Sequence, residues 1–202
     1  MKLKRLVGGN LESNGYIAYE EREGNGYLID PGYQGPRYLK ELDKLGVAVK
    51  AILLTHHHYD HVGAAAFLRK ELGCPVCLHW DDCSMYKGEV DEPLSHGDRF
   101  YFNEEDVSEE NLLVLHTPGH TRGSVCFFNE KFGQVFTGDT VFNVDLGRTD
   151  LEDGSPEDMK RSIGEVVAAW GNGITIYPGH GDSGTMKYVR TYNKEFLDLL
   201  PG

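Results

Sequence analysis

A short apolar run in the first third of the chain leads directly into a dense group of titratable side chains. Residues 51 to 54 are Ala-Ile-Leu-Leu, a sequence typical of a buried strand, and residues 56 to 61 then hold four histidines and one aspartate. Packed imidazoles and a carboxylate repel or desolvate one another unless a metal or dense hydrogen bonding orders them. The strand must therefore end at a site that can neutralise this group.

Three more residues of ligand type occur later in the chain, each in a turn-rich setting. His120 and His180 each follow a Pro-Gly pair, and Asp139 follows a glycine. Each of these turns follows an apolar, strand-like run, so the backbone can aim the side chain inward from a strand end. We therefore predict a metal site that is assembled from several loops.

The spacing of the first histidines predicts one ion. His56 and His58 alternate around His57, so in an extended or sharply turning loop they point the same way while His57 points elsewhere. His120 would complete a three-histidine set. Nitrogen and oxygen ligands without thiolate suit zinc, and they also suit iron or manganese.

The residues that follow predict a second ion. Asp60 and His61 belong to the next turn and can serve an ion about 3.5–4 Å from the first, a separation typical of two-metal hydrolytic sites. His180 would join them, and Asp139 could bridge both ions through its two oxygens. Asp60 and Asp139 are thus predicted to be catalytic. A single core histidine is usually only a satisfied polar residue, so the prediction rests on the full set of His56, His58, Asp60, His61, His120, Asp139 and His180.

The size and charge of the chain restrict its class. A chain of 202 residues can bury one sizeable core, so we expect residues 1–202 to form a single domain. The formal charge of −12 argues against a nucleic-acid partner. No apolar run has the length of a membrane span or signal peptide, and the four cysteines suggest reduced thiols. We expect a cytoplasmic protein with a small-molecule substrate and no membrane partner, and we leave its oligomeric state open.

Strand-like segments cluster in both halves of the chain, and helices close each half. This order favours two sheets packed face to face with helices outside. The acidic segment 103–111 is interpreted as a solvated loop or hairpin tip. The expected strands are 2–7, 15–19, 27–30, 49–54, 75–79, 99–102, 112–116, 124–128, 135–137 and 174–177, and the expected helices are 37–45, 62–72, 156–170 and 186–197.

Four motifs make the chain resemble the metallo-β-lactamase-fold hydrolases. The family pattern T-H-x-H-x-D-H occurs at residues 55–61, and Pro-Gly-His-Thr, Gly-Asp-Thr and Pro-Gly-His-Gly occur at 118–121, 138–140 and 178–181. The resemblance implies an α/β fold, a four-layer α/β/β/α sandwich with the metals at one edge of the sheets. It also implies that Asp30 hydrogen-bonds the metal loop, the alternative being a simple turn carboxylate.

Within that superfamily the chain is similar to the glyoxalase II-like group, through Gly147-Arg148-Thr149-Asp150. This similarity implies a hydroxyacylglutathione hydrolase-like enzyme, which cleaves a thioester such as an S-acylglutathione with a metal-bridging hydroxide. Full-length glyoxalase II carries a helical C-terminal domain that grips glutathione. The chain ends at residue 202, so we expect that domain to be missing and glutathione recognition to be an open question.

Two other functions remain as alternatives. A mononuclear iron persulfide dioxygenase resembles the same group, including the Gly-Arg-Thr-Asp segment. A non-catalytic structural zinc module is disfavoured, because structural zinc sites are usually closed by four ligands, commonly with cysteine.

The roles of three residues near the predicted centre also stay open. Arg148 and Asp150 either order the active-site loop or position a substrate carboxylate, or they form an internal ion pair that fixes the loop. Tyr59 either lines the pocket or is a half-buried aromatic.

Overall fold

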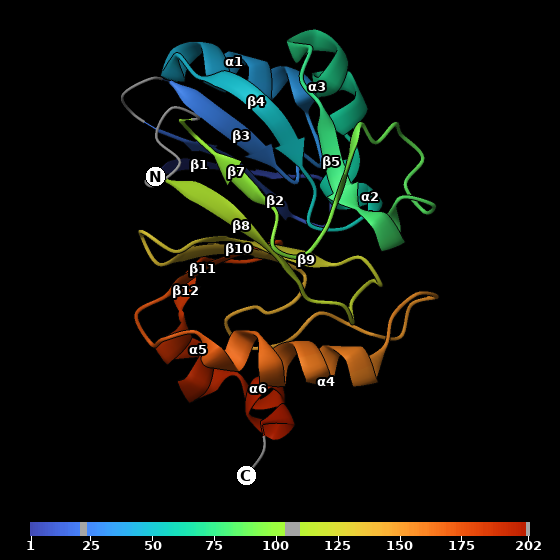
Figure 1. Cartoon of the computed structure of the whole chain (residues 1–202), viewed down its shortest axis with the longest axis vertical. Coiled ribbons are helices and arrows are strands. Elements are labelled where there is room, and N and C mark those ends of the chain that lie inside the picture. Colours follow the sequence, from blue (N-terminus) through green and yellow to red (C-terminus); the bar gives the residue numbers. More distant parts are fainter. Residues whose placement is uncertain (21–23, 104–109, 201–202) are drawn as a thin grey trace.

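The computed structural model describes residues 1–20, 24–103 and 110–200. Two six-stranded sheets pack face to face, and helices cover the outer face of each sheet (Figure 1). The predicted four-layer α/β/β/α sandwich is therefore confirmed. No helix in these ranges is long and apolar enough to cross a membrane.

The first sheet contains the strands of the first half of the chain in sequence order. Strands β1 to β3 pair antiparallel, and β3 to β6 pair parallel. Parallel pairing places the carboxyl ends of β3, β4 and β5 at one edge of the sheet. The strands are β1 (Lys2–Gly8), β2 (Ser13–Tyr19), β3 (Asn25–Ile29), β4 (Ala48–Leu53), β5 (Val76–His79) and β6 (Glu92–Leu94).

The second sheet has the order β12-β11-β10-β9-β8-β7. Its strands pair antiparallel except for β10 and β11, which run parallel. Gly138 pairs with Pro178 at the ends of these two strands, so Asp139 and His180 leave the sheet close together. The strands are β7 (Arg99–Tyr101), β8 (Asn111–His116), β9 (Val125–Asn129), β10 (Gln134–Gly138), β11 (Thr175–Pro178) and β12 (Gly184–Thr185).

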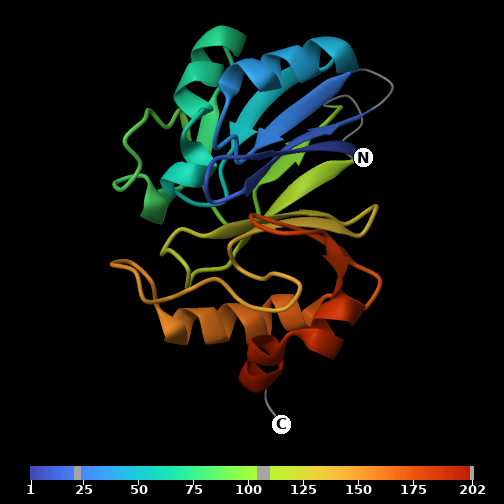
Figure 2. The ribbon, with the colours of Figure 1, turned by 180° about the vertical axis from the view of Figure 1, so that it is seen from behind.

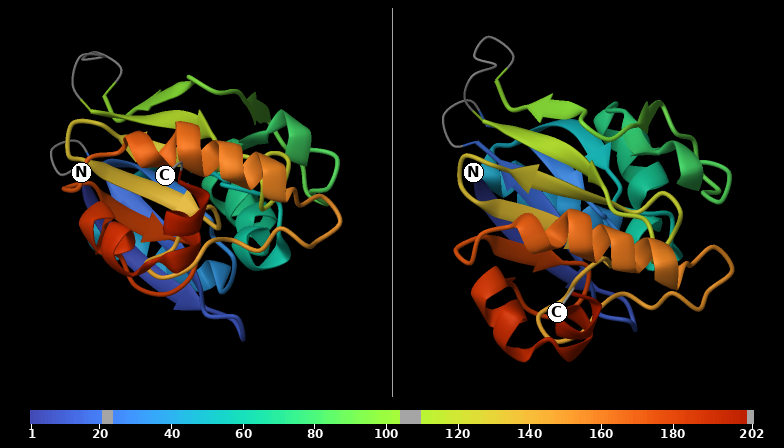
Figure 3. Two further views of the ribbon diagram at one scale, coloured as in Figure 1. Left: turned by 90° about the horizontal axis from the view of Figure 1, so that it is seen from below. Right: turned by 60° about the horizontal axis from the view of Figure 1, so that its bottom comes forward.

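The helices lie in two outer layers. Helices α1 and α3 cover the first sheet, and α4, α5 and α6 cover the second, as the view from behind also shows (Figure 2). Helix α4 lies over the second sheet (Figure 3). The helices are α1 (Gly35–Leu45), α2 (Tyr59–Val62), α3 (Ala65–Leu72), α4 (Pro156–Glu165), α5 (Met186–Tyr192) and α6 (Lys194–Leu199), with short 3₁₀ helices η1 (Trp80–Asp82) and η2 (Val167–Ala169).

Three buried apolar clusters hold the layers together. The central cluster lies between the sheets and contains the fully buried rings of Phe102, Phe127 and Phe136. A second cluster joins α1 and α3 to the first sheet, and a third joins the C-terminal helices to the second sheet. Burial of this apolar surface is the main favourable term in folding. The alternation of buried and exposed residues along β8 reflects a strand with one face in the central cluster.

Three predicted helices are wrong in extent. The helix predicted over 62–72 is two helices, because Gly63 packs so closely on Gly32 that an added Cβ would lie 2.5 Å from its carbonyl oxygen. The helix predicted over 156–170 ends at Glu165 and continues as η2. The helix predicted over 186–197 is divided at Asn193, which has extended backbone angles.

The remaining differences concern short elements. Strands β6 and β12 were not predicted, because segments of three and two residues show no periodicity. Most of the acidic segment 103–111, predicted as a loop or hairpin tip, lies outside the described residues, and Asn111 begins β8.

The buried side chain of Asn193 links the C-terminal helices to the connector between β10 and α4. Its amide donates to the carbonyl oxygens of Phe142 (3.1 Å) and Asp145 (2.7 Å). Its Oδ1 accepts from the backbone N–H of Phe196 and so caps α6. We expect Asn193→Ala to lower the free energy of unfolding by about 1–2 kcal/mol, measured by chemical denaturation, because the cap is lost and two partly buried carbonyl oxygens lose their donor.

A serine variant separates the two contributions of Asn193. Asn193→Ser keeps an oxygen that can cap α6 but lacks the amide donor. Its free energy of unfolding should therefore lie between that of the unaltered protein and that of Asn193→Ala. An alanine variant as stable as the unaltered protein would contradict this account.

Candidate metal centre

Four loops deliver the predicted ligands to one edge of the sandwich. The segment after β4 carries four of them, and the loop between β8 and β9 carries His120. Asp139 directly follows β10, and His180 follows β11. The two sheets meet here, since the amide of Val125 donates to the carbonyl oxygen of Thr55 (2.9 Å) and the Tyr16 hydroxyl donates to that of Pro178 (2.6 Å). The structure thus brings all seven predicted residues together.

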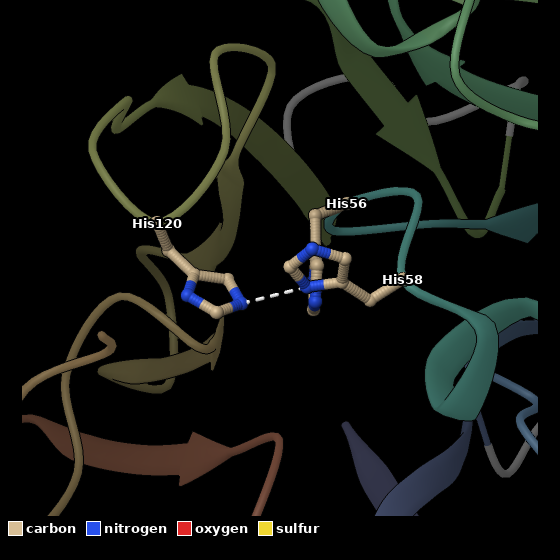
Figure 4. A group of neighbouring side chains, drawn as sticks. All are labelled: His56, His58 and His120. Atoms are coloured by element: carbon tan, nitrogen blue, oxygen red, sulfur yellow. Dashed lines mark hydrogen bonds between the residues drawn. The ribbon is translucent and has the colours of Figure 1, made fainter. Parts of the chain in front are cut away.

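His56, His58 and His120 form the first group. One ring nitrogen from each lies within 4.8 Å of the others, and the Nδ1 of His58 is 2.9 Å from the Nε2 of His120 (Figure 4). The Nε2 of His56 is buried and has no hydrogen-bond partner. A buried polar atom without a partner costs free energy. A cation that accepts three imidazole lone pairs would satisfy these atoms together.

Hydrogen bonds on the opposite ring nitrogens fix the orientation of this group. The Nδ1 of His120 lies 2.8 Å from the carbonyl oxygen of Arg148, to which only an N–H can donate. The Nδ1 of His56 lies 3.0 Å from the Oγ1 of Thr55, which itself donates to Asp30 (2.6 Å). Both rings therefore carry their proton on Nδ1 and direct the Nε2 lone pair into the centre.

Asp60, His61 and His180 form the second group. The Oδ2 of Asp60 lies 3.3 Å from the Nε2 of His61 and 3.2 Å from that of His180. The Nδ1 of His61 lies 3.2 Å from the Oδ2 of Asp30, and the Nδ1 of His180 lies 3.0 Å from the carbonyl oxygen of Leu11. In this group too, the Nδ1 of each histidine contacts an oxygen outside the centre, and the Nε2 faces the centre.

Asp139 lies between the two groups. Its Oδ1 is 3.5 Å from the Nε2 of His61, and its Oδ2 is 3.5 Å from that of His120 and 3.6 Å from that of His180. The Oδ1 atom is buried without a hydrogen-bond partner. A Cβ at Gly179 would lie 2.1 Å from this oxygen, so the glycine makes the position possible. One carboxylate therefore faces both candidate sites.

Asp30 holds the segment between β4 and the ligands. Its carboxylate accepts from the backbone N–H of Thr55 (2.7 Å) and from the Thr55 hydroxyl, and it also contacts His61. Its backbone has a φ of 46°, which is unusual for a residue other than glycine. These contacts place Asp30 as a positioning residue and not as a simple turn carboxylate.

The titration of the two groups differs. Burial, reinforced by the surrounding histidines, lowers the pKa of His56 well below its ordinary value, and burial beside His120 lowers that of His58 to about 4. Burial also acts to lower the pKa of His61, but the carboxylates of Asp139, Asp30 and Asp60 outweigh it and raise that pKa well above its ordinary value. His56 and His58 are therefore neutral at pH 7, whereas His61 holds a proton.

Asp82 is a site residue that the sequence analysis missed. Its buried carboxylate accepts from the backbone N–H of His57 (3.0 Å), from the Thr121 hydroxyl (2.9 Å) and from the backbone N–H of Gly123 (2.6 Å). It also lies 3.0 Å from the Nδ1 of His57. Asp82 thus joins the His56–His61 segment to the loop that carries His120. No local pattern marks it, because these partners lie 25 to 41 residues away.

Three further predicted residues lie around the centre. Arg148 pairs with Asp150, with its Nε 2.7 Å from Oδ1. Both side chains are exposed, and this ion pair favours the loop-fixing interpretation. Tyr59 is 65% exposed, so the interpretation as a half-buried aromatic is wrong. It lines a hollow beside His58.

The sequence of the chain matches a family model and several known proteins. The model of the Metallo-beta-lactamase superfamily matches residues 8–180. An uncharacterized protein of Mycobacterium leprae is 34% identical over 222 residues, which cover 99% of this chain and all of the relative. The hydroxyacylglutathione hydrolase GloC of Haemophilus influenzae is 32% identical, over 85% of this chain and 87% of the relative.

Solved structures show the same fold. The B3 metallo-beta-lactamase BLEG-1 superposes with a TM-score of 0.87 at 26% identity, over 96% of this chain and 98% of its own. TTHA1623 in a di-iron-bound form gives 0.83 at 31% identity, over 95% and 98%. ETHE1 from Myxococcus xanthus gives 0.84 at 25% identity, over 96% and 84%. The family implies divalent metal ions, and the two groups of side chains could hold them.

The contacts of Asp82 predict a role in metal affinity. We expect Asp82→Asn to weaken metal binding by about 10–100-fold, measured by competition with a chelator, because its amide cannot accept from all of its present donors. Asp43→Asn is the matched control, because Asp43 is exposed on α1 and belongs to none of the groups that could hold a metal, so this variant should bind metal as the unaltered protein does. Equal affinity in the two variants would contradict the positioning role.

The raised pKa of His61 predicts that metal binding releases protons at pH 7. A cation must displace the proton from this ring, so metal affinity should rise with pH. Without metal, the pKa of His61 in the folded state lies above its unfolded value of about 6.5. The protonated ring therefore stabilises the folded state fully below that pH, and this stabilisation is lost as the pH rises through the folded pKa. Calorimetric titration with metal in two buffers of different ionisation enthalpy measures the release. An apparent enthalpy of metal binding that is the same in both buffers would contradict the predicted proton release.

Proposed function

This chain belongs to the metallo-beta-lactamase superfamily, and we propose that it is a dinuclear metal-dependent hydrolase that cleaves thioesters of the S-acylglutathione type. The observation that carries the proposal is the position of Asp139, whose carboxylate lies between the two groups. Its Oδ1 is near His61, and its Oδ2 is near both His120 and His180. Two sites that share a carboxylate are typical of two-metal hydrolytic centres. Zinc fits the thiolate-free donor set, as do iron and manganese.

The proposed ligands are the seven gathered residues. His56, His58 and His120 would hold one ion, Asp60, His61 and His180 the other, and Asp139 would bridge them. When bound, such ions lower the pKa of a water and polarise a carbonyl oxygen. Both sheets contribute ligands to this one centre, which supports residues 1–202 as a single catalytic domain.

The protein's own part in the reaction is to place these groups before the substrate arrives. Asp30 and Asp82 hold the segment after β4, and the Arg148 carbonyl holds His120. Asp60 and Asp139 supply the negative charge that balances the cations. A thiolate is a good leaving group, with a thiol pKa of about 8.5, so cleavage of a thioester needs little acid assistance from a side chain. No general acid is therefore assigned.

The relatives support a thioester more than another substrate. The Haemophilus influenzae relative is named as a hydroxyacylglutathione hydrolase, and the match covers 87% of its length. Its likeness to this chain is thus not restricted to part of that protein. A small-molecule thioester is the substrate class that we propose, with no nucleic acid or membrane as partner.

A mononuclear iron dioxygenase acting on persulfides is the second candidate. The resemblance of the Gly147-Arg148-Thr149-Asp150 segment favours it. The two functions differ in metal stoichiometry. One iron per chain, together with oxygen uptake on glutathione persulfide, would replace the hydrolase proposal.

Metal content and substrate assays test the proposal directly. We expect about two divalent ions per chain and hydrolysis of S-lactoylglutathione or simpler thioesters, with a chromogenic cephalosporin as the comparison for β-lactam cleavage. Removal of the metal with a chelator should abolish the activity, and its return should restore it. Cleavage of the cephalosporin without cleavage of any thioester would refute the thioesterase assignment.

The bridging carboxylate gives a sharper prediction. Asp139→Asn should lower both metal content and kcat/KM, the latter by about 100-fold or more, because it removes the charge shared by the two sites. Asp43→Asn on the exposed side of α1 is the matched control and should retain full activity. A variant of Asp139 with full metal and full rate would show that this residue is not a bridge.

A further inference from the structure

Two hollows flank the candidate centre. The connector pocket, of about 580 Å³, contains the proposed ligands His120, Asp139 and His180 among its lining residues. The helix pocket, of about 440 Å³, is lined by His58 and residues of α2, α3 and the segment after η1. Because the Nδ1 of His58 lies 2.9 Å from the Nε2 of His120, the two pockets meet at the centre.

The connector pocket carries several charged and polar side chains. Asn143, Asp145, Arg148 and Asp182 line it beside the ligands, together with the apolar side chains of Phe142, Val144 and Tyr188. Side chains of both charges and an amide can bind a molecule that carries several polar groups. A peptide-like thiol with amide, ammonium and carboxylate groups has this chemistry.

The helix pocket has fewer charged side chains in its lining. Tyr59, Val62, Ala66, Met85 and Tyr86 line it, and no carboxylate does so among the described residues. Tyr59 is 65% exposed and Met85 is 43% exposed, so large apolar side chains face solvent directly beside His58. Apolar surface of this kind next to a reactive centre marks a binding groove for an apolar group.

The charges near the helix pocket are consistent with this character. Lys87 lies at the pocket, while the neighbouring acids Glu89 and Asp91 pair with Arg69 at 3.1 and 2.6 Å. Among the described residues no carboxylate lines the pocket, so an apolar chain that enters it would not remove water from a lining carboxylate.

We infer that the helix pocket binds the acyl group of the substrate, and that this group is apolar and larger than lactoyl. The inference rests on the proposed thioesterase function. A thioester has two arms that meet at the reacting carbonyl, and the two pockets meet at the centre in the same way. Water adds to the carbonyl carbon and the carbon–sulfur bond breaks, giving a carboxylic acid in the helix pocket and a thiol in the connector pocket. A hydroxylated three-carbon lactoyl group would leave most of the apolar lining exposed.

A series of S-acylglutathiones tests this assignment, because only the acyl group changes within it. For acetyl, butanoyl, hexanoyl and octanoyl groups we expect kcat/KM to rise by about two- to fourfold for each added methylene until the pocket is full. Lactoylglutathione should be hydrolysed more slowly than the hexanoyl compound.

Variants locate the effect. Ala66→Trp places a ring in the pocket from an exposed position of α3, and it should lower kcat/KM for octanoylglutathione by about tenfold while changing that for acetylglutathione less than about twofold. Ala169→Trp, at an exposed position of η2, is the matched control and should keep the original length profile. Met85→Glu brings a charge into the same lining and should also reduce the preference for long chains.

The outcomes separate the inference from the function on which it rests. A flat length profile, or a preference for lactoyl that Ala66→Trp leaves unchanged, would overturn the acyl assignment while thioester hydrolysis stands. Failure to hydrolyse any member of the series would overturn the proposed function, and the acyl assignment with it. The acyl assignment would be supported if kcat/KM rises with acyl length in the unaltered protein and in Ala169→Trp but not in Ala66→Trp.

Discussion

The structure depends on one electrostatic constraint, which is that seven imidazole and carboxylate groups converge where few hydrogen bonds can satisfy them. The Nε2 of His56 and the Oδ1 of Asp139 are buried without partners, and the ring nitrogens of His58 and His120 come within 2.9 Å of each other. Such an arrangement is costly in a protein without cations. The surrounding hydrogen bonds from Asp30, Asp82 and the Arg148 carbonyl hold the groups in place against that cost.

Much of the fold could be predicted from the sequence, because its signals are local. Strand ends are indicated by the apolar run before His56 and by the Pro-Gly turns before His120 and His180. The layered architecture follows from their order along the chain. Helix limits failed where a tertiary contact decides them, as at Gly63, which must fit against the backbone of Gly32. Asp82 was missed for a related reason, since its partners come from distant loops and leave no periodic pattern.

The site and the scaffold divide the chemistry between them. The two sheets supply rigid strand ends, whose parallel register at Gly138 and Pro178 sets Asp139 beside His180. The segments beyond the strands form the pockets, and these differ in polarity on the two sides of the centre. A common scaffold with variable loops is the usual way in which one fold serves several substrates. The chain is similar both to a hydroxyacylglutathione hydrolase and to a B3 metallo-beta-lactamase, which agrees with that division.

The sequence separation of the ligands has a consequence for how the protein forms. His58 and His120 are 62 residues apart, whereas His61 and His180 are 119 residues apart. During synthesis, all three histidines of the first group are therefore present before β9 has been made, whereas the other group lacks His180 until the chain has passed β11. Closing a loop of that length costs conformational entropy, and a cation that clips its ends together offsets the cost. Metal supply would then govern the lifetime of the newly made chain against proteolysis as well as its activity.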